Sequence, residues 1–382
     1  MKIRAVAAIL AAALLLCGCA GTSVPAPAPH QSPALSDSSP PPASESTLSA
    51  EDILESMSLE EKAWQMLFVF PENICGEKSC GDADVWAEAL KARPAGGICF
   101  VSANMRSEEE LKAMTSAITA ADNGIFLGLD EEGGKVARLS YALGVTTDFK
   151  PMYEYRGEGA DGAYENARTI AADRSSFGVN MDFAPVADDW TNKATTVIGR
   201  RASSDTPEEA AELVAAAVKG FHSAGVIGVL KHFPGHGNTF EDSHYAAAHT
   251  KKSYGDMREC ELLPFYAGIE AGAEVVMVGH IIAEAIDPGV PATLSPKLIN
   301  GILRGDMGFD GLVITDAFTM VGVGKTPEAE AAVKAVKAGC DMILAPADPD
   351  AVVEAIIENI SVERIDESVL RILELKLGFG LI

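Results

Sequence analysis

From residue 49 onward, short apolar runs alternate along the chain with longer stretches that have helical periodicity. Most of these runs are continuously apolar, which is typical of parallel strands that are covered on both faces. There are eight of them, at residues 66–70, 97–101, 125–129, 179–183, 227–230, 275–278, 312–315 and 342–345. Eight strands that each lead into a helix predict one α/β domain, folded as a single (β/α)8 barrel of the TIM type.

Helix start signals lie between the runs. Thr206 precedes Pro207, which predicts an N-cap followed by the first helical position, and Glu209 is expected to close a capping box. An open, doubly wound parallel sheet is the alternative architecture. The first run is not followed by Gly-x-Gly-x-x-Gly, and this weakens that alternative.

Polar and charged residues follow five of the runs, at the same place in each repeating unit. They are Asp130, Asp182 with Pro185, Lys231 with His232, His280, and Asp316. One such residue is often only a helix cap, but five units that end in Asp, Lys or His are harder to explain in that way. Barrel enzymes carry their chemistry at the C-terminal ends of the strands, so the pattern predicts one shared mouth.

The first residues read as a targeting segment. Lys2 and Arg4 precede an apolar run, residues 5–16, that is too short to span a bilayer as a helix. The run ends in Leu-Cys-Gly-Cys, which resembles the bacterial lipobox and implies a signal peptide over residues 1–18 with lipidation of Cys19. The alternative is an ordinary signal peptide cleaved after Ala20.

Residues 19–49 are rich in Pro, Ser and Ala and have almost nothing to bury, so we expect a disordered tether. The barrel domain is then expected over residues 50–382. Together these segments predict an extracytoplasmic lipoprotein whose contact with the cell membrane is made through its lipid anchor alone.

The chain of 382 residues has a formal net charge of −25. Such an acidic surface repels phosphate backbones, so no nucleic-acid partner is expected. Besides the two N-terminal cysteines there are five, an odd number, so at least one thiol must lack a partner within the chain. Cys75 and Cys80 are close enough to close a small disulfide loop, whereas Cys99 and Cys340 lie in apolar runs and are expected to be buried.

The densest group of titratable residues is the segment 231–244, which carries three histidines, a lysine and two acids. Within it, Asp242 lies two residues before His244, so its carboxylate could orient the imidazole and make it a stronger base. On spacing alone, a turn residue and a surface histidine are the simpler explanation of this pair. His232 and His236 have the spacing of metal ligands on a helix, but Pro and Gly between them forbid a regular helix, so no metal site is predicted.

Two further acids follow apolar runs. Asp316 comes directly after the seventh run and could act as a nucleophile if it stays ionised; the alternative is a helix cap. Asp130 opens the sequence Asp-Glu-Glu-Gly-Gly after the third run and could accept hydrogen bonds from sugar hydroxyls; the alternative is a capped turn.

These segments together resemble a known family. Residues 231–237, Lys-His-Phe-Pro-Gly-His-Gly, followed by Asp242-Ser243-His244, resemble the signature of glycoside hydrolase family 3, in its β-N-acetylglucosaminidase branch. Residues 130–134, residues 197–199 with Arg201, and Thr315-Asp316 with Met320 match in the same order along the chain. The resemblance spans most of residues 50–380.

The resemblance implies a retaining mechanism in two steps. Asp316 matches the nucleophile that forms a covalent glycosyl-enzyme, and His244, supported by Asp242, matches the general acid/base. The residues matching those that hold the N-acetylglucosamine unit are Asp130, Arg138, Arg201, Lys231 and His232. Neither a cofactor nor a metal is implied.

Some details depart from the family pattern. Lys135 stands where the family often has Arg, and Ala202-Ser203 follow Arg201 where Ser-Phe is usual. The end of the chain, residues 375–380, resembles the end of the family's barrel domain, so the second domain of some relatives is expected to be absent.

The expected activity is hydrolysis of terminal β-linked N-acetylglucosamine from a carbohydrate substrate, with peptidoglycan fragments as its source. Two other functions stay open: a β-N-acetylglucosaminide phosphorylase on the same scaffold, and a non-catalytic sugar-binding lipoprotein. Phosphorolysis would release a sugar 1-phosphate, whereas a binding protein would require the loss of a catalytic group. The sequence does not determine the oligomeric state or the natural aglycone.

Overall fold

The computed structural model describes residues 48–382 except 123, 145, 195–196 and 240–247. Its central sheet has eight parallel strands. These are β1 (Leu67–Val69), β2 (Gly97–Cys99), β3 (Phe126–Leu129), β6 (Met181–Asp182), β7 (Ile227–Phe233), β9 (Val275–Val278), β11 (Leu312–Thr315) and β12 (Ile343–Leu344). Seven of the eight predicted runs contain one of these strands, and the run at 227–230 forms the first part of β7, which continues to Phe233.

The sheet closes into a barrel. Neighbouring strands follow the chain order from β1 to β11, and β12 pairs in parallel with β1. A parallel bridge between Ile314 and Met342 joins β11 to the residue that precedes β12. The predicted (β/α)8 barrel is therefore confirmed, and the open doubly wound sheet is excluded.

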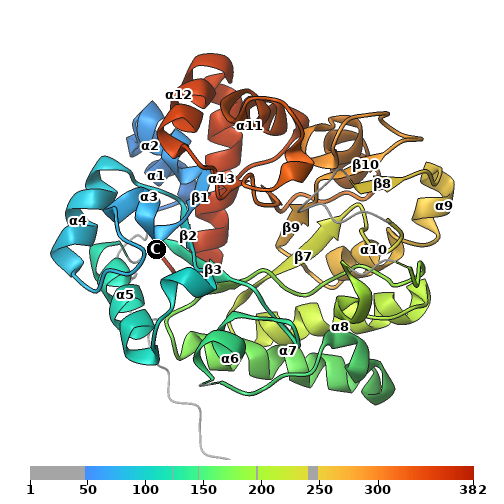
Figure 1. Cartoon of the computed structure of the whole chain (residues 1–382). Coiled ribbons are helices and arrows are strands. Elements are labelled where there is room, and N and C mark those ends of the chain that lie inside the picture. Colours follow the sequence, from blue (N-terminus) through green and yellow to red (C-terminus); the bar gives the residue numbers. More distant parts are fainter. Residues whose placement is uncertain (1–47, 123, 145, 195–196, 240–247) are drawn as a thin grey trace, which may run out of the picture. The chain divides into compact units, whose positions relative to one another are not determined.

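Helices surround the strands as an outer layer (Figure 1). The chain enters through α1 (Ala50–Ser56) and α2 (Leu59–Gln65), which pack against the C-terminal α13 (Val362–Gly378). The helices between strands are α3 (Pro71–Cys75), α4 (Ala83–Ala92), α5 (Glu108–Ala121), α6 (Arg138–Leu143), α7 (Gly159–Ser175), α8 (Pro207–Ser223), α9 (Tyr254–Arg258), α10 (Leu263–Glu270), the π-helical Lys297–Asp306 and α11 (Glu328–Ala338). Helix α12 (Pro349–Asn359) follows the last strand. No helix in the part of the chain that the structure describes is long and apolar enough to cross a membrane.

The start of α8 is only partly as predicted. Thr206 is the N-cap residue and Pro207 the first helical residue, but the threonine side chain caps nothing. Instead the Ser204 hydroxyl donates to Glu209 and accepts from the amide of Thr206. The predicted capping box is wrong because Ser204 takes the carboxylate that would have closed it.

Two strand pairs outside the barrel were not predicted. Strand β4 (Glu131–Gly133) pairs antiparallel with β5 (Val136–Ala137), directly after β3. Strand β8 (Ala248–Thr250) pairs in parallel with β10 (Ile281–Ala283). These pairs are only two or three residues long, too short to give a periodic signal in the sequence.

The barrel interior is filled by a large side chain beside small ones. The ring of Phe68 packs edge-on against Phe183, with 5.4 Å between ring centroids. A Cβ at Gly97 or Gly128 would come within 2.7 Å of that ring. Glycines on β2 and β3 thus leave the space that Phe68 of β1 occupies.

The five described cysteines are free thiols. Cys99 and Cys340 are buried, as predicted, while Cys75 and Cys80 are partly exposed. The disulfide that the sequence allowed between Cys75 and Cys80 is therefore not formed in this structure.

At the N-terminal end of the strands, the buried carboxylate of Asp341 binds three arginines. Its oxygens lie 2.6 Å from Arg304, 3.2 Å from Arg364 and 3.3 Å from Arg371. They also accept from the Ser368 hydroxyl at 2.9 Å and from a backbone amide of β11 at 3.0 Å. This one side chain links β11 to α13 and to the π-helical segment before β11.

We expect Asp341→Asn to lower the free energy of unfolding by about 3 kcal/mol, because three guanidinium groups lose their common carboxylate. Urea unfolding measures the change. The matched control is Asp350→Asn, which removes an exposed partner of Arg93 and should cost less than about 1 kcal/mol. Equal losses in the two variants would contradict this account of Asp341.

Candidate active site

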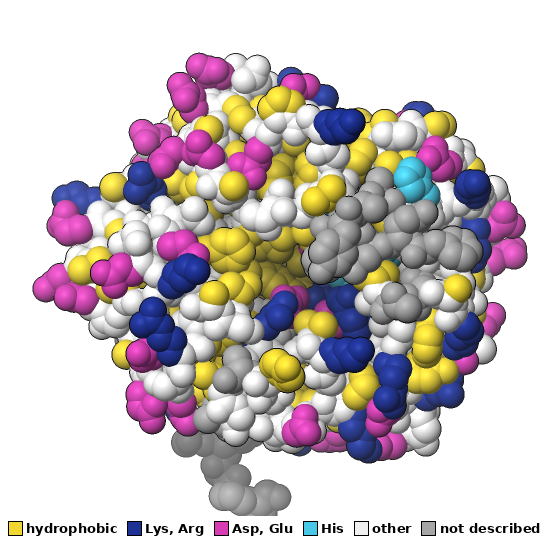
Figure 2. Space-filling view, viewed as in Figure 1, with side chains coloured by type: hydrophobic (Ala, Val, Ile, Leu, Met, Phe, Trp, Pro, Cys, Tyr) yellow, Lys and Arg dark blue, Asp and Glu magenta, His cyan; other side chains and the backbone are white. Residues whose placement is uncertain are grey.

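A cavity of about 250 Å³ opens at the C-terminal ends of the barrel strands. In Figure 2 it appears as a hollow near the centre of the face, with hydrophobic side chains on one side and charged side chains on the other. Its walls come from the C-terminal ends of all eight barrel strands and from the segments that follow them. The main lining residues are Phe70, Cys99, Asp130, Arg138, Phe183, Arg201, Lys231, His232, Met277, Asp316, Met320 and Leu344.

Six residues that the sequence analysis singled out line this one cavity: the expected nucleophile Asp316 and the five expected sugar-binding residues Asp130, Arg138, Arg201, Lys231 and His232. They come from four stretches of the chain, at or after β3, β6, β7 and β11, and meet because parallel strands end at the same edge of the barrel. Asp242 and His244, the expected acid/base pair, lie outside the described residues.

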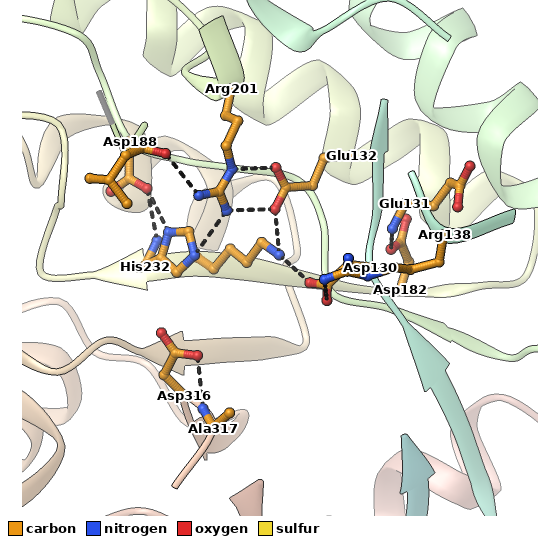
Figure 3. A network of polar contacts seen from close by, with 12 residues as sticks. Asp130, Glu131, Glu132, Arg138, Asp182, Asp188, Arg201, His232, Asp316 and Ala317 are labelled. Atoms are coloured by element: carbon orange, nitrogen blue, oxygen red, sulfur yellow. Dashed lines mark hydrogen bonds and ion pairs between the residues drawn. The ribbon is translucent and has the colours of Figure 1, made fainter. Parts of the chain in front are cut away.

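The charged side chains form an alternating network (Figure 3). The Lys231 ammonium lies 2.6 Å from Asp130 and 2.6 Å from Glu132. Arg201 binds the Glu132 carboxylate with two hydrogen bonds, of 2.7 and 2.8 Å, and Arg138 lies 3.3 Å from Asp130. Since a bidentate pair fixes both partners, the network holds the polar wall of the cavity in one arrangement.

Burial alone would raise the pKa values of the two carboxyl groups. For Asp130 the charges of Lys231 and Arg138 outweigh burial and hold its pKa well below the ordinary value. For Glu132 the charges of Arg201 and Lys231 do the same and lower its pKa to about 2. Burial would lower the pKa of Lys231, but the two carboxylates raise it. All three groups are therefore charged at neutral pH.

A third carboxylate, that of Asp188, lies behind His232. It is fully buried and accepts from His232 Nδ1 at 2.7 Å. On the other side of the ring, Arg201 Nη2 lies 3.3 Å from Nε2. A guanidinium can only donate, so Nε2 is the acceptor and Nδ1 carries the hydrogen that faces Asp188.

No role of Glu132 or Asp188 was predicted from the sequence. Glu132 was noted only as part of the segment that follows Asp130. The one sequence signal for Asp188 is its position shortly after the fourth apolar run. Asp188 and Asp189 look alike in the sequence, and only the folded chain shows that His232 meets the first of them.

Asp316 lies directly after β11, on the other side of the cavity from the charged network (Figure 3). Its amide donates to Val278 of β9 at 2.8 Å, which fixes the backbone against the neighbouring strand. One oxygen of its carboxylate accepts from the amide of Ala317 at 2.8 Å. This local bond orients the carboxylate at the cavity wall.

Three of the residues expected at the mouth do not line the cavity. Asp182 turns toward α7, where it pairs with the buried Arg174 at 2.7 Å. Pro185 is absent from the lining. His280 is buried beside Asp316: its Nδ1 lies 2.9 Å from Thr293 and its Nε2 3.1 Å from the carbonyl of Ala317.

The prediction of one shared mouth was therefore wrong for Asp182, Pro185 and His280. Asp182 is drawn outward by a cation from the helical layer. His280 instead supports the backbone just after Asp316. A polar residue at the end of a strand can be bound by residues outside the cavity. The spacing of residues along the chain does not reveal such partners.

Glu131 has a supporting role next to the network. Its carboxylate accepts from the amides of Leu139 at 2.7 Å and Ser140 at 3.2 Å. These are the first free amides of α6, the helix that begins at Arg138. Glu131 thus fixes the helix start that carries Arg138 into the cavity.

The loop after β7 is shaped by two glycines. Gly235 has φ of +118°, and a Cβ at Gly237 would lie 1.5 Å from the carbonyl oxygen of Asp189. Neither position accepts a larger residue without moving the loop. The path of this loop is therefore fixed by close packing against the segment after β6.

The rings of His236 and His232 lie edge to face, with 6.1 Å between their centroids, but their Nδ1 atoms have different partners. Nδ1 of His236 lies 2.6 Å from the Thr239 hydroxyl, whereas Nδ1 of His232 faces Asp188. Burial lowers the pKa of His236 to about 4, so this ring is uncharged at neutral pH. The two rings do not share the arrangement that their spacing would allow on a helix.

Among the described residues, Asp189, Cys260 and Glu261 are the group whose ligand atoms lie close enough to hold a metal ion. None of them lines the cavity. Glu261 already has a cationic partner in Lys252. This group is therefore separate from the chemistry expected at Asp316.

Comparisons with known proteins agree with this geometry. Residues 58–375 match the family model described as the glycosyl hydrolase family 3 N terminal domain. A β-hexosaminidase of Stenotrophomonas maltophilia is 36% identical over 266 residues, which are 68% of this chain and 78% of the relative.

Two solved structures are also similar. A glycoside hydrolase family 3 β-N-acetylglucosaminidase from Paenibacillus sp. has a TM-score of 0.79 at 34% identity, over 85% of this chain and 63% of its own. The LpqI protein of M tuberculosis has a TM-score of 0.74 at 26% identity, over 86% of this chain and 96% of its own. The match to the family model, over residues 58–375, includes the whole barrel and every described residue of its charged cavity wall. The chain therefore belongs to glycosyl hydrolase family 3.

Proposed function

We propose that this chain is a retaining β-N-acetylglucosaminidase that removes terminal β-linked N-acetylglucosamine. The observation that carries the proposal is the carboxylate of Asp316 in the same cavity as Asp130, Arg138, Arg201, Lys231 and His232. Family membership and the activity named for the relatives support it.

The polar wall is suited to a sugar ring. Asp130 offers carboxylate oxygens to hydroxyl donors, while Lys231 and Arg138 offer N–H groups to hydroxyl oxygens. Because these groups already hold one another at 2.6 to 3.3 Å, little side-chain ordering remains to be done when the sugar binds. The hydrophobic wall, with Phe70 and Met320, can cover the apolar face of the ring.

In the first step, the Asp316 carboxylate attacks the anomeric carbon while the bond from that carbon to the leaving oxygen breaks. The imidazole of His244 donates its proton to that oxygen. In the second step, the neutral imidazole takes a proton from water, whose oxygen attacks the anomeric carbon and releases Asp316. The anomeric centre is inverted twice, so its configuration is retained.

The roles of Asp242 and His244 in this scheme rest on the sequence resemblance. The Asp242 carboxylate would stabilise the charged imidazole while the ring holds a proton. An oxocarbenium-like transition state favours an anion close to the ring, and Asp316 supplies it.

The test is an assay with aryl β-N-acetylglucosaminide, with the matching aryl β-glucoside as control, in buffers with and without phosphate. We expect N-acetylglucosamine as the product in both buffers and much slower turnover of the glucoside. Release of a sugar 1-phosphate in phosphate buffer would show that the enzyme is a phosphorylase and not a hydrolase. Binding of the sugar without turnover would indicate a non-catalytic binding protein.

We further propose peptidoglycan fragments as the natural source of the sugar, because the predicted export signal would place the enzyme close to the cell wall. The comparison is between a muropeptide ending in β-linked N-acetylglucosamine and chitobiose. A higher kcat/KM for the muropeptide supports the proposal, and a higher value for chitobiose contradicts it.

The proposed location is the outer side of the cell membrane, with Cys19 lipidated. Cys19→Ala should move the protein from the membrane fraction to the soluble one and abolish labelling by a palmitate analogue. The control is Cys17→Ala, two residues earlier in the same segment, which should change neither. Membrane retention of Cys19→Ala would contradict the assignment.

A further inference from the structure

We propose that Asp188 is a positioning residue for the glycosidase reaction. Its carboxylate holds both the sugar-binding ring of His232 and the loop after β7, which leads toward the acid/base segment. This inference rests on the proposed function. Asp188 does not line the cavity and touches no reacting atom, so it would act through its neighbours.

The geometry is that of one carboxylate shared between two elements. Oδ2 of Asp188 accepts from the backbone amide of His232 at 3.3 Å and from its ring Nδ1 at 2.7 Å. Oδ1 accepts from the amide of His236 at 2.6 Å. The side chain is fully buried, so no solvent competes for these bonds.

The charge on Asp188 is retained despite this burial. Burial alone would raise its pKa, but His232 and the hydrogen bonds from the two histidines outweigh it, so the pKa is lower than usual. An ionised carboxylate can only accept, which fits the three N–H groups that it faces. Such charge-assisted bonds to N–H groups are shorter and stronger than neutral ones.

The first consequence concerns the His232 ring. With its Nδ1–H held by Asp188, the ring presents Nε2 toward Arg201 and the cavity. Without the carboxylate, the other tautomer becomes available, and its Nε2–H would face a guanidinium that can only donate. Asp188 therefore keeps the ring compatible with Arg201.

The second consequence concerns the loop after β7. The bond from the His236 amide fixes the turn between Phe233 and Thr239 against the segment after β6. The same two segments meet where Gly237 packs on Asp189. The chain that leaves this turn continues into residues 240–247, where the sequence places His244.

The test variant is Asp188→Asn. Its amide offers one acceptor and one donor group in place of two acceptors. If the oxygen faces His232, an NH₂ group meets the amide of His236; if the amide is turned round, it meets His232. One of the two anchors is lost in either orientation.

Two measurements distinguish the loss of either contact of Asp188, to His232 or to the loop amide of His236, from a general structural effect. Loss of the His232 anchor should raise the inhibition constant of N-acetylglucosamine. Loss of the loop anchor should lower kcat/KM more for aryl β-N-acetylglucosaminides with poor leaving groups than for those with good ones, since only poor ones need full protonation. We expect one of these changes to reach about 10- to 100-fold.

The matched control is Asp341→Asn, another buried aspartate with several donors, placed at the opposite end of the barrel. At a temperature where Asp341→Asn is folded, it should change neither the inhibition constant of N-acetylglucosamine nor the dependence of kcat/KM on the leaving group. Asp188→Ser serves as a second variant if Asp188→Asn does not fold.

If the wild type is active and the Asp188 variants match it within about two-fold in both readouts, the inference is overturned. Failure of both variants to fold would also overturn it, in favour of a purely structural role. Absence of wild-type activity on aryl β-N-acetylglucosaminide would instead refute the proposed function.

Discussion

Asp316→Ala is expected to lower kcat on aryl β-N-acetylglucosaminide by about 10⁴-fold or more, in the range found when a catalytic nucleophile is removed. The carboxylate lies in the cavity wall after β11, held by the amide of Ala317. Without it, no covalent glycosyl-enzyme can form, and the oxocarbenium-like transition state loses its nearest anion.

Added azide provides a second measurement. Azide can take the place of the missing carboxylate and attack from the same face, so Asp316→Ala should form an α-glycosyl azide from an activated aryl substrate. The control is Asp310→Ala, which removes an exposed aspartate at the other end of the same strand and should retain full activity. Wild-type turnover in Asp316→Ala would refute the nucleophile assignment.

Lys231→Met should lower kcat/KM by about 10²- to 10³-fold, mainly through KM. Such a loss equals about 2.7 to 4.1 kcal/mol of transition-state stabilisation. Folding stability should also fall, by the roughly 3 to 5 kcal/mol that is typical of breaking a buried ion pair. Lys231 is almost fully buried and contacts both Asp130 and Glu132, so its removal leaves two neighbouring carboxylates with less compensating charge. Steady-state kinetics and urea unfolding measure the two effects.

The same variant should change the dependence of stability on pH. In the wild type, the low pKa of Glu132, about 2, contributes stability that is complete above the unfolded value near 4.3 and is lost as pH falls toward 2. In Lys231→Met that pKa lies closer to the unfolded value, so the free energy of unfolding should fall less between pH 5 and 3.

Lys62→Met is the matched control for Lys231→Met. It breaks a lysine–aspartate pair, with Asp366, far from the cavity at the N-terminal helices. KM should stay at its wild-type value in this variant. An unchanged KM in Lys231→Met as well would contradict the role of Lys231 in sugar binding.

The strands were predictable because each buried parallel strand is a continuous apolar run. The described site residues were predictable because the C-terminal ends of such strands converge, which brought Asp130, Lys231 and Asp316 to one cavity. Both conclusions need only the order of elements along the chain, together with the resemblance to the family.

Asp182 and Asp188 show what the sequence could not give. Asp130 and Asp182 both lie at the end of an apolar run, but Arg174 of α7 takes Asp182 out of the cavity. Asp188 carries no pattern of its own, and its importance depends on His232 arriving from another strand. Such contacts are tertiary, so they depend on how helices and loops pack over the barrel.

The central claim is that Asp316 becomes covalently attached to the sugar during turnover. A fluorosugar that forms the glycosyl-enzyme but slows its hydrolysis tests this directly, by the mass of the intact protein and of its peptides. We predict a mass increase of one sugar residue, located on the peptide that contains Asp316. An active enzyme that acquires no label, or acquires it on another peptide, would contradict the account.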